Sequence, residues 1–414
     1  MIYQPENVKG FEDYLPPESQ KREKIKEIAV KYFKLYGFLP VETPTIEFDE
    51  LMKGDAIGEE DEAVRDRFRL RDRANRNLGL RYEFTFQLAR ILKQNPNIKL
   101  PFKKYQIGSV FRDENIKLGR TREFTQCDID IIGDPNINAD AECLAVVSDI
   151  LKELKIENVE IEVNNRKLVD EIIKSVKIDE KQQVLREIDK INKIGEDQVK
   201  MNLKKYADSN QILSLFKLME KDVNFFKDNM FEGSQELIDL VQRCKEYGVK
   251  IKFNPSLMRG FNYYTGNVFE VSVGKTSLFG GGRYDKLVGK YLNKEIPAVG
   301  ISFSIESIMG LCVNEINKLD LDKTQAIVIS IDQDKEAIKL SQNLRKNNIN
   351  AITSFDKVGK ALEYANAYQT PYAIFVGKDE IKNKKFKLKN MQSGEESLLA
   401  EKSIISKLKK IKIL

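Results

Sequence analysis

The residues best suited to chemistry lie in two neighbouring segments with the alternating pattern of β-strands, residues 103–112 and 123–132. Successive side chains of a strand point to opposite faces, so the second segment has one apolar face that can pack on a core. Its other face is polar apart from one aromatic side chain, which indicates the floor of a pocket rather than plain structure. That face carries Phe124, Gln126, Asp128 and Asp130.

Arg112 ends the first segment with the same strand parity as Lys104, Gln106 and Gly108, and Arg120 follows in the connecting loop. An arginine can clamp a phosphate, an aromatic ring can stack on a base, and a carboxylate can accept from an amino group. An exposed charged hairpin would be the simpler interpretation if this stretch stood alone.

The chain has no histidine, and its four cysteines are scattered without a C-x-x-C pair. The missing histidines exclude Ser-His-Asp triads, Cys-His dyads, histidine general bases and histidine-ligated metal centres. The cysteine spacing argues against structural disulfides and cysteine-rich zinc sites. We therefore predict no protein metal site, and chemistry carried out by carboxylates, Lys, Tyr, Arg and Mg²⁺.

The bulk composition bounds the class of protein. With 414 residues the chain is too long for one ordinary core, and 41% hydrophobic with 32% charged residues is typical of a soluble globular protein. No apolar run approaches the ~18–20 residues of a membrane span. The N-terminal residues lack the signature of a signal peptide, so we expect no membrane association and a cytoplasmic location.

The charge is unevenly distributed. Residues 323–414 hold 18 Lys+Arg against 10 Asp+Glu, a net charge of +8, which leaves 1–322 at −3 within a total of +5. A basic module on a near-neutral body indicates a polyanionic partner, although a lysine-rich solvated surface explains the charge equally well.

The periodicity of the N-terminal region predicts an amphipathic helix over residues 20–36, with Ser19 as its cap and Gly37 at its end. The segment Val41–Ile46 then has the composition of a strand that Pro44 interrupts. Proline lacks a ladder donor, so this strand is expected at an edge or an interface.

The rest of the pattern predicts two domains. Residues 1–322 form the first, with a charged, helical insertion over about 165–250 and further strands over 251–306. Residues 323–414 alternate as β-α-β-α-β, a small α/β domain. The triple glycine that starts at Gly280 predicts either a tight turn or a place where a ligand approaches the backbone closely.

Several of these segments resemble the ordered motifs of class II aminoacyl-tRNA synthetases. They are residues 37–44, the hairpin around Arg112, and the glycine-rich strand and helix over 300–309. Two more narrow the resemblance to histidyl-tRNA synthetases: residues 80–85 look like the amino-acid-binding strand of that family, and residues 257–264 like a segment peculiar to it. The resemblance covers nearly the whole chain and is closest to archaeal and eukaryotic members.

The resemblance implies an α+β fold, with the antiparallel class II sheet, flanking helices and a helical insertion, followed by an α/β anticodon-binding domain. It implies that L-histidine and ATP, with Mg²⁺, give histidyl-adenylate, and that the histidyl group then passes to the 3′ end of histidine tRNA. It also implies a homodimer that uses the helix 20–36 and the strand with Pro44.

The resemblance further implies roles for single residues. Arg112 and Arg259 would be the catalytic residues, on either side of the α-phosphate. The loop from Asn115 to Gly119 would approach the tRNA acceptor stem. The implied amino-acid-binding residues are Glu83, Phe84, Thr85, Gln126, Asp130, Tyr263, Tyr264 and Tyr284. The implied ATP-binding residues are Arg112, Glu114, Arg120 and Phe124.

This sequence departs from the pattern of the resembled family at three positions. Ser307 replaces the arginine that lies over adenine, Ser304 replaces a glycine just before it, and Asn262 replaces an aspartate. Two non-catalytic alternatives therefore stay open. One is a synthetase-like regulatory subunit of ATP phosphoribosyltransferase, which normally lacks the anticodon-binding module. The other is a sensor of uncharged tRNA.

Overall fold

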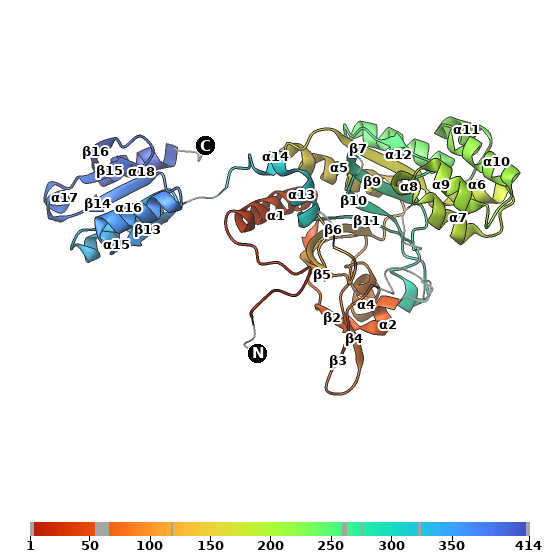
Figure 1. Ribbon diagram of the computed structural model, residues 1–414, viewed down its shortest axis with the longest axis horizontal. Coiled ribbons are helices and arrows are strands. Elements are labelled where there is room, and N and C mark those ends of the chain that lie inside the picture. The colour runs from red at the N-terminus through yellow and green to blue at the C-terminus, as the bar shows by residue number, and fades with distance from the viewer. Residues whose placement is uncertain are drawn as a thin grey trace. The chain divides into compact units, whose positions relative to one another are not determined.

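The structure is a computed structural model, and the chain divides into two compact units, Met1–Lys318 and Leu319–Leu414 (Figure 1). None of the helices within the described ranges is long and apolar enough to cross a membrane. The residues that the structure describes are 4–53, 66–116, 119–258, 263–274, 276–321 and 324–410.

The first unit is built on a sheet whose described strands number eight, in the order β1-β5-β6-β11-β10-β9-β7-β8. Its central pairs are antiparallel, whereas β1 runs parallel to β5 at one edge and β8 parallel to β7 at the other. The predicted antiparallel sheet is confirmed. The strands are β1 (Leu39–Pro40), β5 (Phe102–Phe111), β6 (Glu123–Ile132), β7 (Val159–Asn165), β8 (Lys252–Phe253), β9 (Asn267–Val273), β10 (Thr276–Arg283) and β11 (Ala298–Ser304).

The predicted N-terminal helix is α1 (Glu18–Leu35), and Gly37 follows its end with a φ of 79°, as the C-terminal signal predicted. The prediction that Ser19 caps the helix is wrong. Pro17 occupies the cap position without a side-chain hydrogen bond, and Ser19 lies in the first turn. Buried apolar residues one helical turn apart, including Ile25, hold α1 against α5 (Ile137–Glu153) and α13 (Ile305–Leu311).

The prediction of a strand over Val41–Ile46 is also wrong. Strand β1 ends at Pro40, and after one more ladder bond, from the Val41 N–H to the carbonyl of Tyr105 at 2.9 Å, the chain leaves the large sheet. Pro44 cannot donate to a ladder, which fits a crossing between two sheets. The second, small sheet has the order β2-β4-β3. Its strands and neighbouring helices are β2 (Ile46–Phe48), α2 (Asp49–Lys53), β3 (Arg69–Arg71), β4 (Asn77–Leu80) and α4 (Phe86–Gln94).

The region between β7 and β8 is helical, as predicted. Its last helix, α12, packs against α5 and β7, so the helical insertion is attached to the large sheet at that point (Figure 1). The helices of the insertion are α6 (Arg166–Ser175), α7 (Lys181–Ile188), α8 (Ile191–Ile194), α9 (Glu196–Leu203), α10 (Ser209–Met219), α11 (Val223–Asp228) and α12 (Ser234–Glu246). The first unit also contains η1 (Lys290–Leu292) and α14 (Val313–Ile316).

The second unit has its own sheet, in the order β13-β12-β14-β15-β16. The predicted β-α-β-α-β pattern is confirmed, because its three strands pair in parallel around β12. Two antiparallel strands, β15 and β16, extend the sheet beyond that prediction. The elements are β12 (Ala326–Ser330), α15 (Asp334–Lys346), β13 (Ala351–Ser354), α16 (Val358–Ala367), β14 (Tyr372–Val376), α17 (Lys378–Asn383), β15 (Phe386–Asn390), β16 (Glu396–Leu399) and α18 (Glu401–Lys410).

Candidate active site

A polar pocket lies over the centre of the large sheet, where β6, β10 and β11 run side by side. Three kinds of group line it: acidic and amide side chains, tyrosines and one arginine. The predicted site residues that line it are Glu83, Thr85, Arg112, Gln126, Asp130, Tyr263, Tyr264 and Tyr284.

The floor of the pocket comes from alternate residues of β6. Gln126, Asp128 and Asp130 are all buried and all line it, as the alternation predicted. The Gln126 amide donates from Nε2 to both carboxylate oxygens of Asp128, at 2.8 and 3.0 Å. Burial raises the pKa of Asp128 well above its usual range; the charge of Lys104 opposes this shift and that of Asp130 adds to it.

Asp130 is held by Lys104 of β5 and by Tyr284, the residue that follows β10. Its Oδ2 lies 2.6 Å from Nζ of Lys104, a lysine with no exposed surface on β5. Its Oδ1 accepts a hydrogen bond from the hydroxyl of Tyr284. A Cβ at position 300 would stand 2.1 Å from that same oxygen, so β11 needs Gly300 to leave room for the carboxylate.

Three tyrosines cover one side of the pocket. The ring of Tyr263 lies 4.8 Å from that of Tyr264 and 5.9 Å from that of Tyr284, between centroids. Burial, together with the neighbouring charge of Asp130, raises the pKa of Tyr284 well above its usual value. The phenol therefore keeps its proton at neutral pH and remains a hydrogen-bond donor.

Glu83 and Thr85 lie in a turn that leads into α4, and residues 81–85 do not form the strand that the resemblance implied. Strand β4 ends at Leu80, opposite the first residue of β2, and after one more bond, from the N–H of Arg81 to the carbonyl of Thr45 at 2.9 Å, the chain leaves the small sheet. Glu83 accepts from the backbone N–H of Phe86 at 2.7 Å in the first turn of α4. Burial raises the pKa of Glu83, although hydrogen bonds from Thr85 and Phe86 oppose the shift.

Phe84 does not line the pocket. Its ring has no exposed surface and packs beneath the guanidinium of Arg81, 4.9 Å from the ring centroid. It therefore supports the turn from the core, and we assign it no contact with a substrate.

Arg112 follows the end of β5 and lies between two aromatic rings, with its guanidinium carbon 4.3 Å from the centroid of Tyr82 and 4.9 Å from that of Phe124. Within the described residues its guanidinium makes a single hydrogen bond, from Nε to the carbonyl of Tyr82 at 3.4 Å. The two rings hold the planar guanidinium at the pocket while leaving most of its donors available to a ligand.

The other implied ATP-binding residues flank Arg112 without lining the pocket. Phe124 contacts Arg112 as described. Nη1 of Arg120 lies 3.8 Å from Oε2 of Glu114, and 61% of the Arg120 side chain is exposed. These side chains lie on the loop and strand that continue from the pocket, where a long ligand could extend.

Ser304 and Ser307 have a structural role at the start of α13. The hydroxyl of Ser304 accepts from the backbone N–H of Ser307 at 3.0 Å, which caps the helix. The hydroxyl of Ser307 donates to the carbonyl of Gly119 at 3.3 Å, so the loop after β5 packs closely on this helix.

Two sequence predictions fall outside the described residues. Arg259 and Asn262 lie within the segment 259–262, and the loop implied to approach the acceptor stem includes residues 117 and 118. Their roles stay predictions from the resemblance.

Sequence reasoning left two features of the pocket without a role. Asp128 was placed on the pocket face but given no function, and Lys104 was recognised only by its strand parity. Of the two predictions for the triple glycine, the tight turn is wrong: the glycines lie inside β10, and a Cβ at Gly281 would stand 2.1 Å from the carbonyl oxygen of Gly300. Gly280 and Gly281 also line the pocket, and the close approach of a ligand to this backbone stays a prediction.

The profile of the family described as histidyl-tRNA synthetase matches residues 10–308, and that of the anticodon binding domain matches residues 325–411. The chain belongs to the histidyl-tRNA synthetase family. It is 37% identical to histidine–tRNA ligase 1 of Bacillus cereus, over 94% of each chain. It is 34% identical to histidine–tRNA ligase of Clostridium tetani, over 97% of this chain and 98% of that one.

The fold agrees with these sequence relationships. The crystal structure of a histidyl-tRNA synthetase from a Nostoc species matches with a TM-score of 0.87 and 27% identity, over 99% of both chains. The predicted family and fold class are confirmed, and the relatives favour a ligase over the two non-catalytic alternatives. The sequence relatives named here are bacterial, so they lend no support to the predicted closeness to archaeal and eukaryotic members.

Proposed function

We propose that this chain is a histidine–tRNA ligase, which activates L-histidine with ATP and transfers the histidyl group to the 3′ end of histidine tRNA. The observation that carries the proposal is one pocket that brings acidic, amide, tyrosine and arginine side chains together. Glu83, Gln126, Asp130, Tyr284 and Arg112 all line it. An amino acid with a polar ring needs these kinds of contact.

The substrate's α-ammonium group would bind to Glu83 and Gln126. The Glu83 carboxylate is buried, and an ammonium ion beside it would favour its charged form. The Nε2 atom of Gln126 is occupied by Asp128, which leaves the amide oxygen as the acceptor for the ammonium. Thr85, which also lines the pocket, offers a third acceptor.

The imidazole ring would bind beside Asp130 and the tyrosines. Asp130 can accept from one ring nitrogen and Tyr264 offers a hydroxyl group to the other, while Tyr284 donates to Asp130 and holds that carboxylate for the ring. Tyr263 packs beside these tyrosines. A site built around such contacts rejects an apolar side chain by ~10⁴–10⁵, because buried polar groups would be left without partners.

Arg112 would bind the α-phosphate of ATP, and Arg259 would do so from the other side. A carboxylate oxygen of histidine attacks the α-phosphorus, the bond to the bridging oxygen breaks, and pyrophosphate leaves. The substrate carboxylate is already ionised, so the reaction needs stabilised phosphate charge rather than a protein base. This chemistry requires no protein histidine.

Phe124 would stack on adenine, Glu114 would accept from its amino group, and Arg120 would bind the distal phosphates. Ser307 cannot cover the base as an arginine would, which predicts weak ATP binding rather than loss of chemistry. Mg²⁺ would arrive bound to the β- and γ-phosphates of ATP. Among the described residues no group of three acidic or cysteine side chains could hold a metal ion by itself.

In the second step a hydroxyl of the 3′-terminal ribose attacks the acyl carbon and AMP leaves. Residues 323–414, with their net charge of +8, would bind the anticodon stem. At the C-terminal end of α16 the ring centroids of Tyr364 and Tyr368 lie 4.6 Å apart, and the two residues are 48% and 63% exposed. Such a pair offers a platform on which a base can stack.

A homodimer is the assembly that the surface of the first unit favours. In the single chain, four large apolar residues of β1, β2 and β3 are 39–58% exposed to solvent. They are Leu39, Ile46, Phe48 and Leu70. An exposed apolar surface of this kind is typical of an interface.

The test is exchange of labelled pyrophosphate into ATP, with each amino acid in turn. We expect exchange with histidine and none with phenylalanine or glutamine. No exchange at saturating ATP would refute the ligase, and exchange driven by another amino acid would refute the assignment of the pocket to histidine.

A further inference from the structure

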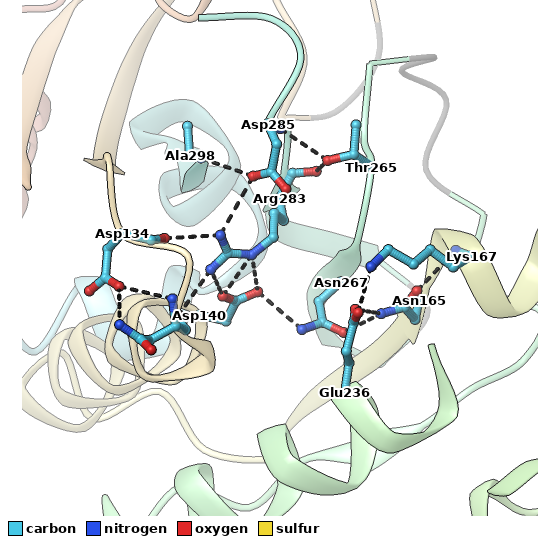
Figure 2. A network of polar contacts seen from close by, with 11 residues as sticks. Asp134, Asp140, Asn165, Lys167, Glu236, Thr265, Asn267, Arg283, Asp285 and Ala298 are labelled. Carbon is cyan, nitrogen blue, oxygen red and sulfur yellow. Dashed lines mark hydrogen bonds and ion pairs between the residues drawn. The ribbon is translucent and has the colours of Figure 1, made fainter. Parts of the chain in front are cut away.

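A second polar network lies beside the pocket, centred on Arg283 at the end of β10 (Figure 2). The guanidinium is bound through all three of its nitrogens. Nε and Nη2 donate to the carboxylate of Asp140, and Nη1 and Nη2 donate to the carbonyls of Asp134 and Asn136 at 3.0 and 3.1 Å. Asp140 has no exposed surface. Arg283 is therefore fully used within the protein and has little capacity left for a ligand.

The network lies next to two tyrosines of the pocket, Tyr264 just before β9 and Tyr284 just after β10. Tyr284 directly follows Arg283, and the backbone N–H of Thr265, the residue after Tyr264, donates to the Arg283 carbonyl at 2.7 Å. The hydroxyl of Thr265 accepts from the N–H of Asp285 at 3.0 Å. These bonds hold the segments that carry Tyr264 and Tyr284 against each other.

The same network continues into the helical insertion. Asn267 donates to Asp140 at 3.1 Å and accepts from Asn165 at 2.9 Å, and both asparagines are buried. Asn165 also donates to Glu236 of α12 at 2.8 Å, and Glu236 lies 2.5 Å from Nζ of Lys167. Figure 2 shows this unbroken chain from Arg283 to Lys167.

The backbone follows the same path. Asn165 is the N-cap of α6 and accepts from the N–H of Lys167 at 2.9 Å, while the N–H of Arg166 donates to the carbonyl of Gly266 at 2.8 Å. The first turn of the insertion is therefore bonded to the residues that directly follow Tyr263 and Tyr264.

We propose that the Arg283–Asp140 pair positions Tyr264 and Tyr284 for recognition of the histidine ring, and that Asn165, Asn267 and Glu236 extend this support to the insertion. The insertion then contributes to histidine recognition from outside the pocket, without touching the substrate. The inference rests on the proposed function, because it needs the tyrosines to take part in binding histidine.

The physical basis is the cost of small displacements in a preorganised site. A shift of about 1 Å in a group that contacts the substrate can lower the rate about 100-fold. Tyr284 has little room to move, since its hydroxyl is already bonded to Asp130 and its backbone N–H to the carbonyl of Ala298 at 2.7 Å. Without the network, the segments that carry Tyr264 and Tyr284 would lose the hydrogen bonds that hold them from the side away from the substrate.

The experiment compares three variants of the full chain in the pyrophosphate exchange assay. Asn267→Ala breaks the centre of the network, and we expect the KM for histidine to rise about tenfold while the KM for ATP stays within about twofold. Glu236→Gln weakens the outer end, where the side chain is 39% exposed and loss of folding is not expected, and should raise the KM for histidine about threefold. Glu196→Gln alters an exposed ion pair with Lys200 in the same insertion, outside the network, and is the matched control with no expected change.

Equal KM values for histidine in all three variants and the wild type would overturn the inference. So would a parallel rise in both KM values, which would mean a disturbance of the whole pocket, or a fall in apparent kcat with unchanged KM values, which would mean a loss of folded protein. If Asn267→Ala fails to fold, Glu236→Gln decides the question. Wild-type protein that neither binds histidine nor exchanges pyrophosphate would instead refute the proposed function.

Discussion

Arg112 and Arg283 both lie at the ends of strands in the large sheet, yet their surroundings differ. The guanidinium of Arg283 is bound through every nitrogen to groups of its own chain, whereas that of Arg112 makes one hydrogen bond within the described residues and lies between two rings. The negative partner of Arg283 is the carboxylate of Asp140 in the same chain. The proposed negative partner of Arg112 is the α-phosphate of ATP, which arrives with the substrate. The difference supports two separate proposed roles for the same side chain, Arg283 in holding the site together and Arg112 in binding the phosphate of the substrate.

Arg283→Ala should have the largest effect on stability. It leaves Asp140 buried without its partner, and breaking a buried ion pair in this way costs about 3–5 kcal/mol. Urea unfolding measures this loss, and Arg112→Ala should lose less than about 1 kcal/mol in the same experiment. Equal losses in the two variants would contradict the structural role of Arg283.

Arg112→Ala should have the largest effect on chemistry. Removing one preorganised donor from a phosphate transition state lowers the rate by about 10²–10³. Pyrophosphate exchange at saturating substrates measures it, with Arg243→Ala as control, because Arg243 pairs with Glu246 at an exposed end of α12. A rate within tenfold of the wild type would remove Arg112 from the catalytic residues.

Tyr284→Phe should have a smaller and more selective effect. The loss of a hydrogen bond to a charged group costs about 1.5–3 kcal/mol, or roughly 10- to 100-fold in kcat/KM for histidine. The KM for ATP should not change. Tyr291→Phe, at a tyrosine 38% exposed in η1, is the matched control. An unchanged kcat/KM for histidine would mean that the Tyr284 hydroxyl does not contribute to binding of the substrate's imidazole ring.

The smallest predicted effect is a pH dependence from Glu83. Because burial raises the pKa of this carboxyl, it protonates at a higher pH than an ordinary glutamate as the pH falls, and then no longer attracts the substrate's ammonium. The KM for histidine should therefore rise several-fold on acidification from pH 8 to about 5.5.

The substrate's own imidazole also titrates in this range, near pH 6.5. Glu83→Gln separates the two causes, because the substrate titrates equally in both proteins. Its KM should be raised at pH 8 and should depend less on pH than that of the wild type. Identical pH profiles would show that Glu83 does not bind the ammonium.

The pocket floor could be predicted from the sequence because it depends on local alternation. Gln126, Asp128 and Asp130 fall on one face of any regular strand, whatever the fold around it. The β-α-β-α-β part of the second unit has the same local basis. Strand β15 also had this signal, since Phe386 and Leu388 alternate with lysines, but the lysine-rich composition hid it.

The second network could not be predicted in this way. Arg283 and Asp140 are 143 positions apart in the sequence, and nothing local to either one indicates the other. The turn at Glu83 likewise depends on where β4 loses its partner in the small sheet, and pairing between distant strands is not a local property. The family resemblance supplied the proposed functional residues, whereas the buried residues that support them could be identified only from the three-dimensional structure.

The most direct test is the charging of histidine tRNA by the full chain, with labelled histidine, ATP and Mg²⁺. We predict that label becomes attached to the tRNA, that one AMP forms for each histidine transferred, and that Arg112→Ala slows the reaction about 10²–10³-fold. A wild-type protein that leaves the tRNA uncharged at saturating histidine and ATP would contradict the proposed function.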